Sequence, residues 1–209
     1  PQIHALLCDY EYKLYPTEPE NLDAFFSDKS LKGYNITIPY KVDAYNHCHE
    51  LSETAKKIGS VNTIIRREDG TLFGDNTDYF GFRSMVAQSR LEVPGKKVLV
   101  LGSGGASNTV VAVLEELGAT PIVISRSGEN NYENLHLHAD ARVIVNTTPV
   151  GMYPRNGESP IDLSAFPKCE GVLDVIYNPF HTALLQQAAH RQIPGQTPER
   201  RFGDFIYFR

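Results

Sequence analysis

The stretch Val98-Leu99-Val100-Leu101-Gly102-Ser103-Gly104-Gly105-Ala106-Ser107 indicates the architecture of this chain. Four apolar residues lead directly into a glycine cluster, and a small apolar run, Val110–Leu114, follows. This order predicts a buried parallel strand, a tight turn and a helix. Glycines permit positive φ and close backbone approach, and the free N–H groups of the helix start favour an anion. The usual anion at such a turn is a diphosphate, so the stretch predicts a dinucleotide site, with a glycine turn that binds no nucleotide as the alternative.

The end of the next predicted strand, Thr120–Ser125, indicates which dinucleotide the turn would bind. Ser125-Arg126-Ser127 stand at about the distance from the glycines at which such folds meet the adenosine ribose. An acidic residue there would bind the ribose 2′-hydroxyl, whereas a guanidinium with two hydroxyls suits a 2′-phosphate. The pattern therefore favours NADP over NAD, and an ordinary loop arginine is the alternative.

Composition limits the class of protein. The chain has 209 residues, of which 41% are hydrophobic, enough for one large or two small domains. A net charge of −5 argues against nucleic acid and anionic membranes as partners. No apolar run approaches the roughly 20 residues of a membrane span, and the first residues carry no signal-peptide pattern. Three separated cysteines (Cys8, Cys48 and Cys169) predict reduced thiols and a cytoplasmic protein, and no residue spacing predicts a metal site.

A second candidate site precedes the glycine turn. Asn35–Ile38 predicts a strand, and Pro39 suits the first position of the following helix, which places Lys41 in its first turn. A cation is unusual there because the helix dipole is positive at that end, and such conflicts often mark function. Gly59–Ile65, which contains Asn62, begins a hairpin that turns at Asp69-Gly70, and its return strand Thr71–Gly74 leads to Asp78. The alternatives are that Asn62 and Asp78 only stabilise turns and that Lys41 is an ordinary solvated surface residue.

Six motifs occur in one order and together carry a resemblance to a known family. They are Asn35–Lys41, Gly59–Thr63, Gly74–Gly81, Gly102–Ala106, Asn146–Met152 and Asp174–Pro179. With these motifs the chain resembles shikimate dehydrogenase from Pro1 to about Pro194.

The resemblance implies an α/β protein of two domains. Residues 1–82 would form the substrate-binding α/β domain and residues 83–182 a Rossmann NADP-binding domain, with the carboxyl-terminal segment, about 183–209, packing back on the first. The implied activity is the NADP-linked interconversion of 3-dehydroshikimate and shikimate in aromatic amino-acid biosynthesis, in a cleft between the domains. The implied partners are small molecules, and the implied assembly is a monomer or homodimer.

The resemblance also implies residue roles. Lys41 and Asp78 would be the catalytic pair, and the physical chemistry agrees, because an ammonium beside a ketone oxygen stabilises the charge that hydride transfer places there, a contribution of ~10²–10⁴-fold. The substrate would contact Thr37, Asn62, Asp78 and Tyr177. The cofactor would contact Gly102, Ser103, Gly104, Gly105, Ala106, Ser125, Arg126, Ser127, Thr147 and Ile176.

Two departures from the family pattern accompany the resemblance. A family Ser-x-Ser-Pro motif, whose hydroxyls bind the substrate carboxylate, would stand just before Pro1, and a segment with a substrate-binding Gln is missing near Pro194. We therefore expect that the sequence lacks the first strand and a stretch near Pro194. Two alternatives remain: an NAD-using quinate/shikimate dehydrogenase, against which Arg126 argues, and a catalytically idle nucleotide sensor or interaction paralogue, against which Lys41 and Asp78 argue.

Overall fold

The computed structural model of the chain describes residues 4, 6 and 9–198. These residues divide into two compact units, one that ends at Lys32 and one that begins at Gly33. In the first unit, η1 (Pro19–Asn21) leads directly into helix α2 (Leu22–Ser27). Pro19 stands at the start of η1, where a backbone N–H would have no partner within the helix, so its missing N–H costs nothing. The ring of Phe25 lies 5.5 Å from that of Tyr15, centroid to centroid. Cys8 lies outside the described residues, whereas Cys48 and Cys169 are free thiols, as predicted.

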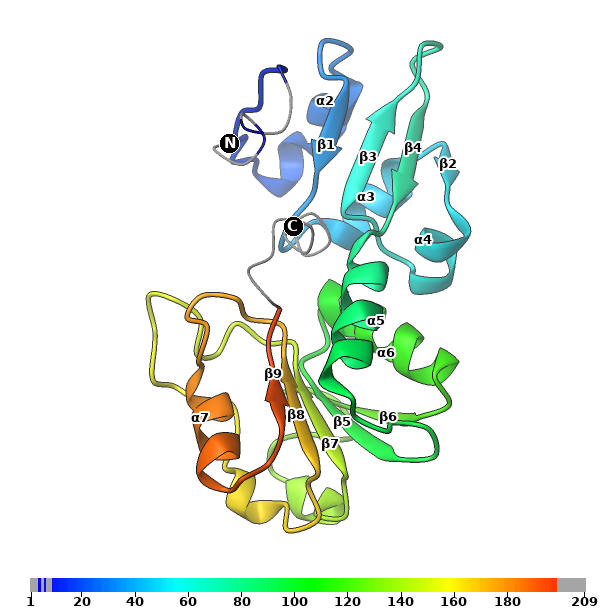
Figure 1. The fold of residues 1–209 in the computed structure, drawn as a ribbon. Coiled ribbons are helices and arrows are strands. Elements are labelled where there is room, and N and C mark those ends of the chain that lie inside the picture. The colour runs from blue at the N-terminus through cyan, green and yellow to red at the C-terminus, as the bar shows by residue number, and fades with distance from the viewer. Residues whose placement is uncertain (1–3, 5, 7–8, 199–209) are drawn as a thin grey trace. The chain divides into compact units, whose positions relative to one another are not determined.

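The second unit begins with a four-stranded mixed sheet (Figure 1). In chain order its elements are β1 (Gly33–Asn35), α3 (Lys41–His47), β2 (Glu50–Leu51), α4 (Glu53–Ile58), β3 (Thr63–Arg66) and β4 (Leu72–Asp75). The strand order is β1-β3-β4-β2, antiparallel except for the parallel β2–β4 pair. The predicted hairpin turn is confirmed: Gly70 has a φ of 88°, and its N–H donates to the carbonyl of Arg67 at 2.9 Å.

The start of this sheet differs from the sequence prediction in detail. Strand β1 ends at Asn35 rather than at Ile38. Helix α3 begins at Lys41, so Pro39 lies in the preceding turn rather than at the first helical position, and the N–H of Tyr40 closes that turn by donating to the carbonyl of Thr37 at 3.0 Å. Lys41 nonetheless lies in the first turn of the helix, as predicted.

A five-stranded, fully parallel sheet follows in the same unit. Its elements are α5 (Asp78–Ser89), β5 (Lys97–Leu101), α6 (Gly105–Glu116), β6 (Thr120–Ile124), η2 (Leu135–His138), β7 (Val143–Asn146), η3 (Leu163–Ala165), β8 (Gly171–Asp174), α7 (Ala183–His190) and β9 (Gly195–Gln196). The order β6-β5-β7-β8-β9 places β6 on one side of β5 and β7 on the other. Sheets of this kind bind ligands where the order reverses, at the carboxyl ends of the strands. The predicted strand, glycine turn and helix are confirmed, and with them the α/β fold class.

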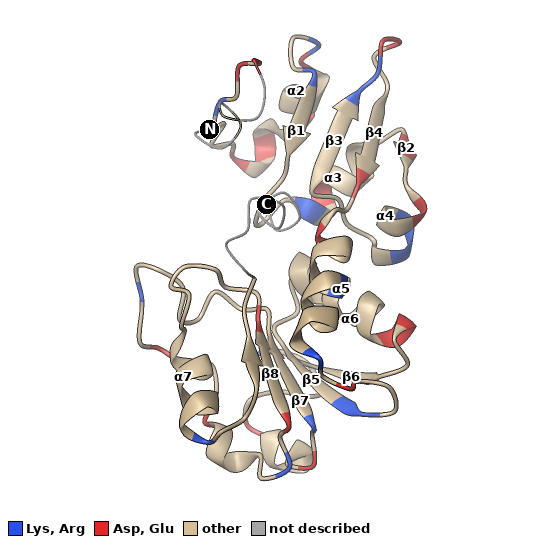
Figure 2. Ribbon diagram, in the orientation of Figure 1, with Lys and Arg blue, Asp and Glu red and all other residues tan. Residues whose placement is uncertain are grey.

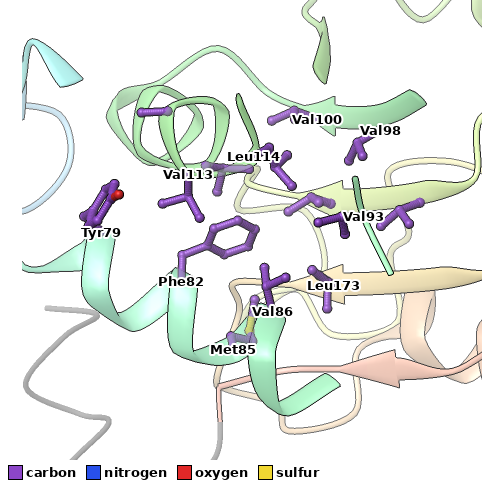
Figure 3. Packing of buried hydrophobic residues seen from close by; sticks show 14 of the residues in the cluster. Tyr79, Phe82, Met85, Val86, Val93, Val98, Val100, Val113, Leu114 and Leu173 are labelled. Atoms are coloured by element: carbon purple, nitrogen blue, oxygen red, sulfur yellow. The ribbon is translucent and has the colours of Figure 1, made fainter. Parts of the chain in front are cut away.

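The parallel sheet has a hydrophobic core on each face. Val100 of β5 faces α5 and α6, and Figure 3 shows Phe82 of α5 pointing toward Val113 of α6. Leu101 of β5 belongs to the other face, which is covered by Leu184 of α7. Figure 2 shows no charge in the middle of these strands. Burial on both faces explains why β5 is apolar at four consecutive positions, Val98–Leu101, rather than alternating.

The described part of the carboxyl-terminal segment belongs to the parallel sheet. Leu184 and Leu185 of α7 are buried in its second core, and β9 pairs in parallel with β8. Residues 183–196 therefore lie on this sheet, while residues 199–209, the rest of the segment that the sequence assigned to the first domain, lie outside the described residues. In the described part of the chain, no helix combines the length and the apolar character that crossing a membrane requires.

Candidate active site

Lys41 and Asp78 form an ion pair across 37 positions of sequence. Nζ of Lys41 donates to Oδ2 of Asp78, and the two side chains are only 12% and 8% exposed. Asp78 is the first residue of α5, where a carboxylate is stabilised by the helix dipole, and it compensates the unfavourable position of the lysine at the start of α3. The fold thus brings the predicted catalytic pair together in a poorly hydrated place, where the attraction between the charges is strengthened.

The second carboxylate oxygen of Asp78 has no hydrogen-bond donor. Its Oδ1 is buried and unpartnered within the described part of the chain. Leaving a buried acceptor unsatisfied is costly, typically about 1–3 kcal/mol. A ligand hydroxyl would satisfy this oxygen while Oδ2 continues to hold Lys41.

Asn62 positions the start of α5 and hence Asp78. Asn62 is completely buried, and its Oδ1 accepts the backbone N–H of Thr77 at 3.0 Å, while its Nδ2 donates to the Thr77 hydroxyl, also at 3.0 Å. The next turn residue, Asn76, donates through Nδ2 to the carbonyl and hydroxyl oxygens of Ser60 at 3.1 and 3.0 Å. These contacts anchor the loop before α5 to the segment before β3. Sequence reasoning found Asn62 but assigned no role to Ser60 or Asn76, because the bonds join residues that are distant in the chain.

The pair lies beside the glycine turn. A Cβ placed on Gly105 would lie 3.2 Å from Cβ and 3.3 Å from Cδ of Lys41. The aliphatic stem of the lysine therefore packs against the first residue of α6. This contact joins the two candidate sites that the sequence predicted separately.

The glycine turn has the features that a diphosphate requires. Gly102 has a φ of 107°, and a Cβ there would lie 2.8 Å from Oγ1 of Thr147, so only glycine fits without strain. Around Gly104, the N-cap of α6, a Cβ would meet no heavy atom within 4 Å. The N-cap residue Gly104 has no side chain with which to cap the N–H groups at this helix start, as suits an anion site. Ser103 and Gly104 are exposed, and Ala106 follows in the first turn.

The loop after β6 has the form expected of a site for the adenosine end. Arg126 and Ser127 are exposed, as contact with a ligand requires. The loop is closed by the N–H of Ser125, which donates to the carbonyl of Asn130 at 3.1 Å. A Cβ on Gly128 would lie 2.6 Å from Oγ of Ser125, so the glycine makes room for that hydroxyl. An exposed guanidinium between two serines fits a phosphate dianion.

The remaining predicted residues lie at the carboxyl ends of strands or in turns. Thr147 follows β7 and donates through Oγ1 to the carbonyl of Leu101 at 2.7 Å, which seats it against the glycine turn. Ile176 is buried and Tyr177 half-buried just after β8, and Thr37 is exposed in the turn before α3. The predicted substrate contacts of Thr37 and Tyr177 stay predictions.

Sequence reasoning missed a buried carboxylate, Asp174, the last residue of β8. Asp174 is completely buried, and burial raises the pKa of its carboxyl to about 6, although three hydrogen-bond donors oppose the rise. The available signal was a carboxylate that ends a strand otherwise apolar and therefore buried.

Comparisons with known proteins agree with this arrangement. Residues 2–64 match the family model described as "Shikimate dehydrogenase substrate binding domain". A protein named shikimate dehydrogenase (NADP(+)) from Clostridium beijerinckii is 35% identical over 207 residues, 89% of this chain and 76% of that protein. The crystal structure of shikimate dehydrogenase 1 from Peptoclostridium difficile matches with a TM-score of 0.83 and 34% identity, over 95% of this chain and 80% of that one. A shikimate 5-dehydrogenase from Thermus thermophilus, solved in complex with NADP(H) and shikimate, matches with a TM-score of 0.81 and 30% identity, over 99% and 84% of the two chains.

Proposed function

The chain belongs to the shikimate dehydrogenase family, and from this membership we propose that it catalyses the reversible, NADP-linked interconversion of shikimate and 3-dehydroshikimate. The observation that carries the proposal is the buried Lys41–Asp78 pair packed against the first residue of α6, next to the glycine turn. In this reaction the enzyme acts as an oxidoreductase on a CH–OH group and serves the biosynthesis of aromatic amino acids.

The chemistry of the site divides between cofactor and protein. Bound NADP would supply the acceptor for the hydride of the alcohol carbon, and bound NADPH would supply the hydride donor for the ketone carbon. The ammonium of Lys41 stabilises the negative charge that develops on the substrate oxygen, and the Lys41–Asp78 pair exchanges the proton at that oxygen, a contribution of ~10²–10⁴-fold in rate. Oδ2 of Asp78 orients the lysine, and the unpartnered Oδ1 accepts a hydrogen bond from a second substrate hydroxyl.

The remaining roles follow from position. Thr37 and Tyr177 contact the substrate, and Asn62 contacts it or holds the groups that do. The diphosphate binds at Gly102–Ala106 and the 2′-phosphate at Ser125–Ser127. Thr147 and Ile176 line the cofactor site from the neighbouring strands. In this assignment residues 1–82 form the substrate-binding domain and residues 83–182 the NADP-binding domain.

An absorbance assay at the nicotinamide band tests the proposal, with shikimate and quinate each offered with NADP and with NAD. We expect turnover of shikimate with NADP to have the highest kcat/KM. Equal kcat/KM for NADP and NAD would remove the role of Arg126 and favour the quinate/shikimate dehydrogenase alternative. No turnover of either substrate would refute the proposal.

A Lys41→Ala variant separates an enzyme from a nucleotide sensor. We expect most of kcat to be lost, with little change in the Kd for NADP measured by calorimetry. Activity near that of the unaltered protein would show that Lys41 is not the catalytic group.

We also propose where the enzyme is located and how it assembles. The acidic net charge and the free thiols of Cys48 and Cys169 support a cytoplasmic enzyme that meets only small-molecule ligands. We propose a monomer or homodimer, which light scattering after size exclusion tests. A larger assembly would contradict this assignment.

A further inference from the structure

A buried polar network joins the ends of β7 and β8. The last residues of the two strands, Asn146 and Asp174, are partners in the parallel register, and Nδ2 of Asn146 donates to Oδ1 of Asp174 at 3.1 Å. The hydroxyl of Thr182 donates to Oδ2 of Asp174 at 2.7 Å. All three residues are at most 1% exposed. The network is therefore a fixed part of the interior at the carboxyl edge of the sheet.

Each member of the network holds a loop in place. Oδ1 of Asn146 accepts the N–H of Thr148 at 3.0 Å and its hydroxyl at 2.7 Å, which shapes the turn after β7. Oδ1 of Asp174 accepts the N–H of Ile176 at 3.1 Å, which shapes the turn after β8. Thr182 is the N-cap of α7 and accepts the N–H of Leu185 at 3.4 Å. Asp174 thus connects two loops and a helix start.

The network needs a carboxylate at position 174. Its two oxygens accept three donors, from Asn146, Ile176 and Thr182. An asparagine would offer one acceptor and would direct an N–H₂ group at one of these donors. Retaining a buried carboxylate is costly, as its raised pKa shows, so packing alone does not explain the residue.

The loops after β7 and β8 lie on the side of β5 opposite the loop after β6, which is the candidate site for the adenosine end of the cofactor. Arg126 follows β6, whereas β7 and β8 lie beyond β5 in the other direction. A dinucleotide spans this reversal, so its nicotinamide half falls on the β7–β8 side. Thr147 lies between Asn146 and Thr148, which are hydrogen-bonded to each other, and it contacts the glycine turn. Ile176 is the second residue of the loop after β8.

We propose that Asp174 is a positioning residue for the nicotinamide half of the cofactor, holding the loops that carry Thr147 and Ile176 without touching the cofactor itself. The inference rests on the proposed NADP-linked function. Its consequence is that loss of the carboxylate weakens binding of the whole dinucleotide but not of its adenosine half.

Calorimetry on the full chain tests this inference with two probes, NADP and 2′,5′-ADP, which carries only the adenosine half. For Asp174→Asn we expect about tenfold weaker NADP binding, the size expected for a lost charged hydrogen bond, and an unchanged Kd for 2′,5′-ADP. The matched control is Asp140→Asn, because Asp140 pairs with Lys97 at the surface and its side chain is 58% exposed. It should alter neither Kd.

A second pair of variants covers the case in which Asp174→Asn does not fold. Thr182→Val removes the hydroxyl donor, and Thr182→Ser keeps it, so valine should weaken NADP binding and serine should restore it. Equal weakening of NADP and 2′,5′-ADP would show a general structural role and overturn the inference, as would an unchanged NADP Kd in folded Asp174→Asn. Unaltered protein that binds NADP but does not oxidise shikimate would refute the proposed function alone, and the two Kd values would still decide the role of Asp174.

Discussion

Replacing Gly102 with alanine should destabilise the chain by two separable effects. The residue has a φ of 107°, and an alanine held there costs about 1–3 kcal/mol in backbone strain. Its Cβ would also lie 2.8 Å from Oγ1 of Thr147 and 3.1 Å from Cγ2 of Thr148, an overpacking that costs about 1–3 kcal/mol. Together we expect a loss of about 2–6 kcal/mol in the free energy of unfolding. For a chain of this size that corresponds to a fall in Tm of about 10 °C.

Gly70→Ala is the matched control, because Gly70 has a φ of 88° but a Cβ there would meet nothing within 4 Å. It should show the backbone cost alone. Adding Thr147→Ala to Gly102→Ala removes both atoms of Thr147 beyond Cβ, so the double variant should recover part of the loss as a positive coupling in a double-mutant cycle. Urea unfolding monitored by circular dichroism gives the free energy of unfolding of the unaltered chain, of the single variants Gly70→Ala, Gly102→Ala and Thr147→Ala, and of the double variant. If Gly102→Ala were no worse than Gly70→Ala, or if the cycle showed no coupling, the close approach of Thr147 to the glycine turn would be refuted.

Three further predictions concern the pair, the buried carboxylate and the core. Asp78→Asn should lower kcat by about 10²-fold or more with little change in the Kd for NADP, because it removes the charge that orients Lys41; kcat near that of the unaltered enzyme would contradict this. The pKa of Asp174 in the folded state is raised to about 6, so the folded state binds this proton more tightly than the unfolded state does. The resulting stabilisation, about 3 kcal/mol, is complete below about pH 4 and is lost as the pH rises through 6. Between pH 4 and 7, the free energy of unfolding in urea should therefore decline less steeply with pH for Asp174→Asn than for the unaltered chain. Identical slopes would refute the raised pKa of Asp174. Phe82→Ala should cost about 3–5 kcal/mol, since Phe82 is 1% exposed between α5 and α6, and a loss below about 1 kcal/mol would mean that the core closes around the gap.

Local sequence patterns predicted the features whose causes are local. The apolar run before Gly102, the small residues after it and the Asp69-Gly70 turn each depend on neighbouring residues, and the structure has all three where they were expected. The start of α3 was displaced because Pro39 fits a turn as well as a first helical position, and proline alone does not distinguish the two.

Features that depend on strand register could not be predicted from the sequence. Asn146 and Asp174 lie 28 positions apart and meet only because β7 and β8 align in one particular register. The packing of Lys41 on Gly105 likewise depends on the fold bringing α3 to the start of α6. Individual side chains of the site were therefore predictable from motif and strand-end position, but the bonds that hold them were not.

The contact between Lys41 and Gly105 has a consequence for how this sequence can vary. Glycine at position 105, the first residue of α6, leaves room for the aliphatic stem of Lys41, the first residue of α3. The Cβ of an alanine there would lie 3.2 Å from Cβ and 3.3 Å from Cδ of Lys41, so the stem of the lysine would have to shift to make room. The residues at positions 41 and 105 are therefore coupled by packing, and a glycine turn grafted from another protein would have to be selected together with the start of α3.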